Sequence, residues 1–181
     1  QRLGSAPLQW LFDRVARPLS GPARSGCLWR GLRPVALDGT SLELQCTEAN
    51  SRRFGRPGNQ PGEGGCPRVQ VVALLECATR APIGVVEGPC HEDEPSLAEN
   101  LWGKLQPDML LLADHACFSF ARWRDAADRC GALLWRVKSN VKLKPVQHLA
   151  DGSYLAQIRP SNRLIRKGLA EKGECMTVRV V

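Results

Sequence analysis

The sequence predicts a mixed α/β domain in which helices cover a sheet and a strand-rich segment follows. The first observation is an order of apolar runs and helical patterns that reads strand-strand-strand-helix-strand-helix-strand. The second is the alternation of basic and apolar residues over positions 138–181. The third is size, because 181 residues of which 43% are hydrophobic can bury the core of one such domain.

An amphipathic helix is expected near the start of the chain, over residues 7–19. One helical stripe collects the apolar side chains Leu8, Leu11, Phe12, Val15 and Leu19. Pro18 is expected to end this helix, and the Gly-, Pro- and Arg-rich residues 20–33 follow as a linker. We therefore assign residues 1–31 to an N-terminal helix and linker.

The core is expected over residues 32–137. Strands are predicted over residues 34–44, 68–79, 81–89, 108–114 and 132–138, and helices over residues 95–105 and 118–130. Gly131 is placed to end the second of these helices, and Trp102, Trp123 and Trp135 fall on core faces. Residues 55–67, rich in Gly and Pro, predict a mobile loop.

Composition and charge exclude several classes of protein. There is no apolar run of about 18 residues, so a membrane-spanning helix is not expected. P-loop, GxGxxG and GxSxG motifs are absent. Residues 1–35, 36–135 and 136–181 carry net charges of +5, −5 and +7. An acidic centre between basic flanks favours a polyanionic ligand around a site that contains carboxylates, although solvated surface loops would give the same pattern.

The eight cysteines are scattered and form no CxxC pair, which argues against a structural zinc site. An even number of cysteines also allows a disulfide framework. With no secretory signal in sight, we expect buried, reduced thiols instead. The sequence starts without Met and ends in a strand-like run, which favours a piece of a longer protein.

Two aspartates stand where strands are predicted. Asp38 interrupts the first run, where Asp-Gly could equally form a hairpin turn. Asp114 ends a wholly apolar strand, where sheets of this class gather their ligand-binding groups, although it could also cap the next helix. If the two strands are neighbours, both carboxylates can hold a divalent metal such as Mg²⁺ for displacement at phosphorus.

Other candidates are open to two interpretations each. The acidic cluster at residues 91–94 precedes a helix, so a solvated cap is favoured over a supporting metal or DNA role. His115 could contact substrate phosphate or be structural. Basic side chains that could contact a DNA backbone are Arg52, Arg53 and Arg56 beside the glycine-rich loop, and Lys138, Lys142 and Lys144, expected along one β-face.

Read together, several strings resemble the DDE transposases of the insertion-sequence-four family. They are LFDRVARPL, VALDGTSLEL, TEANSRRFGRPG, VVALLECATRAPIG, LLLADHACFSFARW, GALLWRVKSNVKL and LADGSYLAQI, in the family's order over most of residues 8–158. The resemblance implies a ribonuclease-H-like fold with a β-rich insertion, whose start would be residues 138–181. It also implies that Asp38, in the LDGT string, and Asp114, in the LLAD string, are the first two of three catalytic, metal-binding acids.

By this resemblance the function is metal-dependent hydrolysis and strand transfer at transposon ends, with Mg²⁺ or Mn²⁺ as cofactor. DNA, both transposon ends and target, would be the partner, with a possible homodimer in a synaptic complex. No membrane association is expected, and the location would be the bacterial cytoplasm, at the nucleoid.

The third acid, a Glu, is expected beyond Val181, so this chain alone should be inactive. The sequence also departs from the family pattern: His115-Ala116 stands in place of Arg-Gly, and Cys46-Thr47 in place of Asp-Thr. The alternatives are therefore an inactive DNA-binding remnant of a transposase and a different ribonuclease-H-like nuclease.

Overall fold

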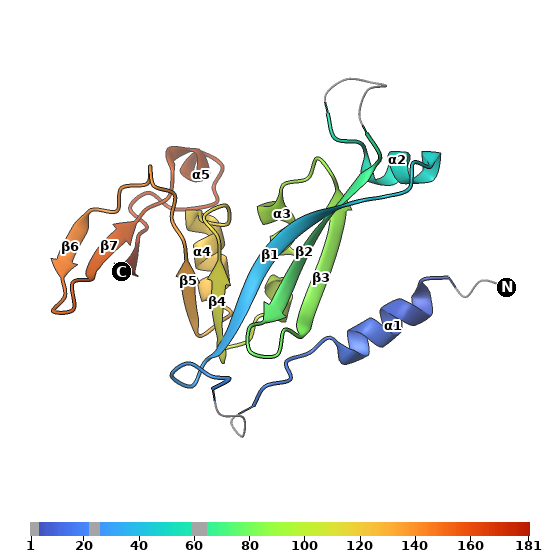
Figure 1. Ribbon diagram of the computed structural model, residues 1–181. Coiled ribbons are helices and arrows are strands. Elements are labelled where there is room, and N and C mark those ends of the chain that lie inside the picture. Colours follow the sequence, from blue (N-terminus) through green and yellow to red (C-terminus); the bar gives the residue numbers. More distant parts are fainter. Residues whose placement is uncertain (1–3, 22–25, 59–64) are drawn as a thin grey trace.

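A computed structural model describes residues 4–21, 26–58 and 65–181. Its larger sheet contains β1 (Arg33–Glu43), β2 (Arg68–Glu76), β3 (Pro82–Pro89), β4 (Met109–Ala113) and β5 (Ala132–Trp135). The strand order is β3-β2-β1-β4-β5, antiparallel on the β2 side of β1 and parallel on the β4 side. The predicted mixed α/β architecture is confirmed (Figure 1), but the short helix α2 (Glu48–Phe54), which lies between β1 and β2, was not predicted.

Helices pack on one face of this sheet and build the main core. They are α3 (Glu94–Glu99), the 3₁₀-helix η1 (Trp102–Lys104) and α4 (Phe120–Ala127). Strand side chains that alternate toward these helices, such as Val35 and Leu37 of β1, are buried. The predicted core tryptophans belong to this cluster. Trp135 stacks on Trp102 at 6.5 Å and meets Trp123 edge-on at 5.3 Å.

Both predicted core helices are shorter than expected. The first becomes α3 and then a single 3₁₀ turn, although Leu97, Leu101 and Leu105 are all buried as their spacing requires. The second ends at Ala127 and not at Gly131. Gly131 instead permits a close backbone contact, because a Cβ there would lie 2.4 Å from the backbone oxygen of Pro107. The glycine allows the turn before β5 to approach the turn before β4.

A second, three-stranded antiparallel sheet follows, as the alternating pattern predicted. It consists of β6 (Pro145–His148), β7 (Tyr154–Ile158) and β8 (Met176–Val180), with the short helix α5 (Asn162–Arg166) between β7 and β8. Its own core contains Ala156 and Val178, and Phe120 of α4 packs into it. The two sheets are thus joined through α4.

The predicted β-face for Lys138, Lys142 and Lys144 is wrong. β5 ends at Trp135, and residues 136–144 form an irregular connection with a turn in which the Val141 N–H donates to the Lys138 oxygen. The polar residues Ser139 and Asn140 at the turn interrupt the strand pattern. The three lysines therefore do not share the spacing of a strand.

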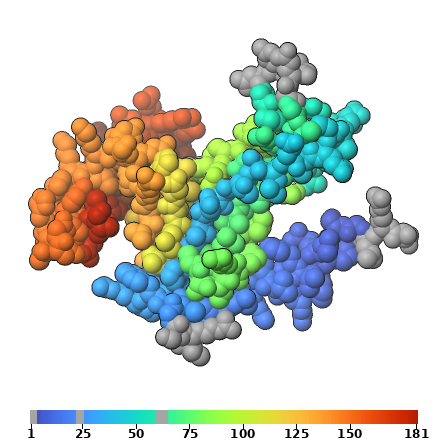
Figure 2. Space-filling view, viewed as in Figure 1, coloured from blue at the N-terminus to red at the C-terminus, as the bar shows by residue number. Residues whose placement is uncertain are grey.

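The N-terminal helix α1 spans Ala6–Val15, shorter than the predicted 7–19. It buries no residue, and Leu8, Leu11 and Val15 are all at least 50% exposed. Figure 2 shows it as a blue lobe beside the body of the molecule. None of the helices in the described ranges is long and apolar enough to cross a membrane.

The chain after α1 is fixed to the sheet by one buried carboxylate, Glu76 at the end of β2. It accepts hydrogen bonds from the backbone N–H groups of Leu19 and Ser20, both at 3.1 Å, and from the hydroxyls of Ser20 and Thr79. Arg33 forms an ion pair with it at 3.1 Å. Burial raises the pKa of Glu76, but these hydrogen bonds outweigh it, and the net result is a lowered pKa.

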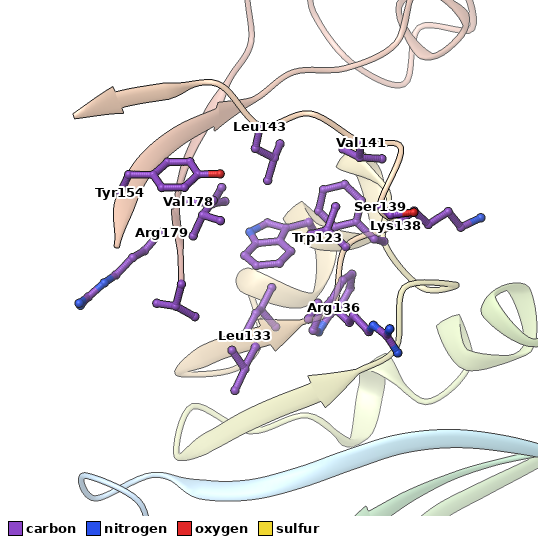
Figure 3. Close-up of a pocket in the computed structure, with 16 residues that line it drawn as sticks. Trp123, Leu133, Arg136, Lys138, Ser139, Val141, Leu143, Tyr154, Val178 and Arg179 are labelled. Carbon is purple, nitrogen blue, oxygen red and sulfur yellow. The ribbon is translucent and has the colours of Figure 1, made fainter. Parts of the chain in front are cut away.

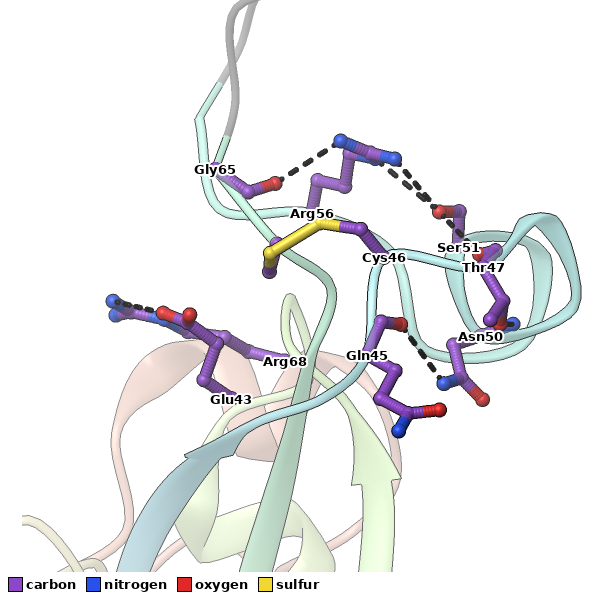
Figure 4. The surroundings of a disulfide bond; sticks show 10 residues. Glu43, Gln45, Cys46, Thr47, Asn50, Ser51, Arg56, Gly65 and Arg68 are labelled. Atoms are coloured by element: carbon purple, nitrogen blue, oxygen red, sulfur yellow. Dashed lines mark hydrogen bonds and ion pairs between the residues drawn. A yellow bond between two sulfur atoms is a disulfide. The ribbon is translucent and has the colours of Figure 1, made fainter.

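The expectation of buried, reduced thiols holds for Cys117 and Cys130, but it is wrong for the exposed Cys77 and Cys175 and for one disulfide-bonded pair. Cys46 and Cys66 form a disulfide whose Cα atoms are 5.0 Å apart (Figure 4). The disulfide joins the segment that follows β1 to the segment that precedes β2. Antiparallel pairing of the two strands brings the end of β1 close to the start of β2. Most of the predicted mobile loop, residues 59–64, lies outside the described residues.

Candidate functional site

The parallel pairing of β1 with β4 brings the two predicted aspartates side by side. Leu37 pairs with Ala113, so Asp38 and Asp114 occupy the next position on each chain. Neighbouring strands lie roughly 4.8 Å apart, which is within the reach of two carboxylates that share one ion. The hairpin-turn alternative for Asp38 is wrong, since Asp38 and Gly39 lie inside β1 and pair with β2.

Both carboxylates line an open groove of about 590 Å³ at the ends of the parallel strands. The groove runs across three adjacent strands, and its other lining side chains are apolar apart from Arg136, which follows β5 directly. Leu134, on the same wall, is 51% exposed. The groove therefore combines two acids and one cation above an apolar floor.

Hydrogen bonds fix the two aspartates differently. Asp38 accepts the N–H of Gly39 on Oδ1 at 2.9 Å. Asp114 contacts Nδ1 of His115 at 2.7 Å. The backbone N–H and the ring of His115, followed by the charge of Arg136, lower the pKa of Asp114. His115, predicted as a phosphate contact, thus binds the neighbouring acid in this structure.

A third carboxylate, Glu94 of the acidic cluster for which a solvated cap was favoured, faces the same end of the sheet. Glu94 begins α3, directly after Asp93, which caps that helix by accepting the N–H of Ser96 at 3.1 Å. The cap interpretation of residues 91–94 therefore fits Asp93. Glu94 instead lies against β1: a Cβ on Gly39 would be 2.4 Å from its carboxyl carbon, so a larger residue at position 39 would displace the Glu94 side chain.

Neighbouring charges affect the pKa values of Glu94 and Cys117. Burial raises the pKa of Glu94, and the charges of Asp38 and Asp114 raise it further, while the N–H of Gly39 partly offsets them. Burial, then the charge of Glu94, raises the pKa of the nearby Cys117 thiol to about 11. In the described ranges, however, no three His, Cys, Asp or Glu side chains are arranged to hold a metal ion together.

Arg136 connects this groove to two further hollows. One, of about 340 Å³, is lined by His115, Arg136 and residues 137–140. The other, of about 390 Å³, lies between the end of β5 and the second sheet, with Trp123 and Tyr154 on its walls and Lys138 at its rim (Figure 3). Arg136 was missed because β5 was expected to continue to residue 138. The sequence feature that could have identified Arg136 is a basic residue directly after a buried strand.

The arginines expected to contact DNA are engaged within the chain. Arg52 forms an ion pair with Glu48 on the same helix, α2 (Glu48–Phe54). Arg53 pairs with Glu87 at 2.6 Å. The Arg56 guanidinium donates to the Ser51 hydroxyl at 3.1 Å and to the Gly65 oxygen at 3.2 Å (Figure 4).

The lysines differ from these arginines. Lys138, Lys142 and Lys144 are exposed, and none forms an ion pair with any of the residues that the structure describes. Lys138 lines the hollow of about 340 Å³ together with Arg136 and His115, whereas Lys142 and Lys144 do not line it. The structure thus brings Lys138, but not the two other lysines, to the side of the groove.

Comparisons with known proteins find similarity to transposases. No family model matches the chain. The transposase InsG of insertion sequence element IS4, from Escherichia coli K12, is 24% identical over 170 residues, which cover 92% of this chain and 38% of InsG. InsZ, another Escherichia coli K12 protein with a transposase name, is 23% identical over 120 residues, 66% of this chain and 40% of InsZ. The chain thus spans about two fifths of the length of these relatives, and its sequence is similar to those of the two transposases.

Proposed function

We propose that this chain is part of the catalytic core of a DNA transposase with a ribonuclease-H-like fold, whose acids Asp38 and Asp114 hold Mg²⁺ or Mn²⁺. The observation that carries the proposal is the parallel register in which Leu37 pairs with Ala113. It gives adjacent positions to the same two aspartates that the resemblance selects. Similarity to InsG, a transposase, supports DNA as the substrate.

The donor groups fit such an ion. Mg²⁺ and Mn²⁺ prefer oxygen ligands, and Mg²⁺ is typically held by one or two carboxylates together with water and substrate phosphate. Asp38 and Asp114 supply two carboxylates at an open groove, and the lowered pKa of Asp114 keeps that group ionised at neutral pH. Bound there, the metal would activate an attacking oxygen and stabilise the leaving oxygen at phosphorus.

The remaining groups of the groove act on position and charge. His115 holds Asp114 by its Nδ1 contact and so limits the rotation of that carboxylate. Arg136 lies on the same wall as both acids, where its cation suits a phosphate oxygen of the DNA backbone. Glu94, against the β1 backbone, adds negative charge near Asp38 and Asp114 and so favours a cation bound beside them.

The rival function is a DNA-binding remnant without activity. It is favoured by His115-Ala116, which stands where the family has Arg-Gly. Salt-dependent binding of duplex DNA without metal-dependent cleavage, in a chain extended to the length of InsG, would favour this rival.

Calorimetric titration of the chain with Mn²⁺ tests the proposal. We expect saturable binding that Asp38→Asn or Asp114→Asn each weakens about tenfold or more, because a lost ligand costs at least as much as a lost supporting contact. Asp13→Asn on the exposed helix α1 removes the same charge and should leave binding unchanged. Equal affinity in all four proteins, or no binding at all, would refute the proposed metal site.

A further inference from the structure

The helix α5 and the residues around it form a basic surface that the metal site does not explain. The segment 159–167 contains four cations and no acid. Its exposed cations are Arg159, Arg163, Arg166 and Lys167. Within the described parts of the chain none of them forms an ion pair, and Arg159 has only the neutral Gln157 as a side-chain partner, at 2.8 Å.

Local structure fixes this surface in place. Ser161 caps α5 by accepting the N–H of Leu164 at 3.3 Å, and Leu164 packs into the core of the second sheet. The cations are therefore carried by an anchored helix. Arg163 and Lys167, four positions apart, lie on one side of it and repel each other. In α2, by contrast, the same spacing pairs Glu48 with Arg52.

A groove of about 510 Å³ separates this surface from α4. The α4 side is neutralised: Arg122 pairs with Glu99 at 2.7 Å, and Arg124 with Glu174 at 3.2 Å. On the α5 side, Arg163 and Lys167 line the groove, and neither forms an ion pair with an acid among the residues that the structure describes. One wall thus holds balanced ion pairs, while the other has free positive charge.

The chemistry of the groove suits phosphate groups. Guanidinium and ammonium groups bind phosphate oxygens, and the hydroxyls of Ser119 and Ser161, which line the same groove, have O–H groups to donate. Ser119 also lies at the end of the loop that begins with Asp114, so one short segment links the groove to the candidate metal site.

We propose that the groove between α4 and α5 binds the phosphate backbone of duplex DNA through Arg163 and Lys167. The inference rests on the proposed function, which supplies DNA as the partner. Residues 159–167 extend the DNA-contacting surface to the second sheet, away from the metal-binding acids. Contacts of this kind give affinity without base sequence preference, because every phosphate is alike.

The test is the salt dependence of binding to a labelled DNA duplex, measured by fluorescence anisotropy. Each phosphate contact adds about 0.9 to the slope of log affinity against log salt concentration. The double substitution Arg163→Gln with Lys167→Gln should therefore lower the slope by about 1.8. The charge-retaining double substitution Arg163→Lys with Lys167→Arg should keep the wild-type slope, which separates charge from folding.

A matched control removes two positive charges elsewhere. Arg80→Gln with Lys172→Gln changes two exposed cations outside the groove and should lower the slope by less than half as much. If the wild-type chain binds DNA but the groove variant behaves like this control, the inference is wrong and the proposed function stands. If the wild-type chain binds no DNA, the proposed DNA partner fails as well.

One further outcome would point to another partner. The surface could attract anionic lipid headgroups by the same charges. Vesicles of phosphatidylserine and phosphatidylcholine in the same salt series address this directly. Tighter binding to these vesicles than to DNA, with loss in the Arg163→Gln/Lys167→Gln variant, would overturn the inference in favour of a membrane surface.

Discussion

Replacing Glu76 with glutamine should release the N-terminal segment from the sheet and destabilise the whole fold. Glu76 is fully buried, and its charge is compensated by Arg33, two backbone N–H groups and two hydroxyls. A hydrogen bond to a charged group contributes about 1.5–3 kcal/mol and a neutral one about 0.5–1.5 kcal/mol. Glu76→Gln removes the charge from several of these hydrogen bonds and removes the ion pair with Arg33. We therefore expect about 3 kcal/mol of destabilisation, which is at the lower end of the cost of breaking a buried ion pair.

Urea denaturation of wild-type and Glu76→Gln proteins measures this difference. The control is Glu87→Gln, which breaks the exposed ion pair with Arg53 and should cost about 1 kcal/mol or less. Trypsin should also cut at Arg14 and Arg17 faster in the Glu76 variant, since the following residues lose their attachment. Equal stability of the two variants would refute the assignment of Glu76 as the buried anchor.

The pH dependence of this effect has a definite sign. The folded-state pKa of Glu76 lies below its ordinary value of 4.5, so its contribution is present above that pH and is lost as the pH falls through the folded pKa. The difference between wild type and Glu76→Gln should therefore shrink in acid. A difference that grows below pH 4.5 would contradict the lowered pKa.

Three further predictions concern β1 and the loop beside it. Glu94→Gln should stabilise the protein at neutral pH and have little effect in acid. A carboxyl whose pKa is raised in the folded state makes the protein less stable as the pH rises and the group ionises. Denaturation of both proteins at the two pH values checks the sign. Gly39→Ala should push the flexible Glu94 carboxyl aside and lower the melting temperature only slightly, and a loss as large as that of a core substitution would show that the Glu94 side chain cannot move. Reduction of the Cys46–Cys66 disulfide, which closes 20 residues of sequence, should cost about 3 kcal/mol in the chain-entropy model, and an unchanged urea midpoint of Cys46→Ser against wild type would rule that out.

The sequence was sufficient for the elements whose pattern reflects burial. The runs around Asp38 and Asp114 are strands because their apolar side chains meet the helices on one face, and the order of elements already implied a mixed sheet. Their side-by-side position followed only if β1 and β4 were neighbours. Which strands are neighbours depends on the tertiary structure, where Leu37 of β1 pairs with Ala113 of β4.

Other features depend on contacts that no local pattern contains. Glu94 lies in a typical helix-capping cluster, so only the packing of α3 against the sheet reveals that it faces β1. The pairing of Cys46 with Cys66 depends on the antiparallel return of β2, and no cysteine spacing indicated it. The glycine after Asp38 was an available signal, since a glycine inside a strand often marks a close approach.

A crystal structure of the chain soaked in Mn²⁺, with anomalous diffraction to locate the ion, would show directly whether Asp38 and Asp114 hold a metal. We expect one anomalous peak between the carboxylates of Asp38 and Asp114, with metal–oxygen distances of roughly 2.1 Å. An ion bound elsewhere, or carboxylate oxygens that stay more than about 5 Å apart, too far to share one ion, would contradict the claim that these two strands build a metal site.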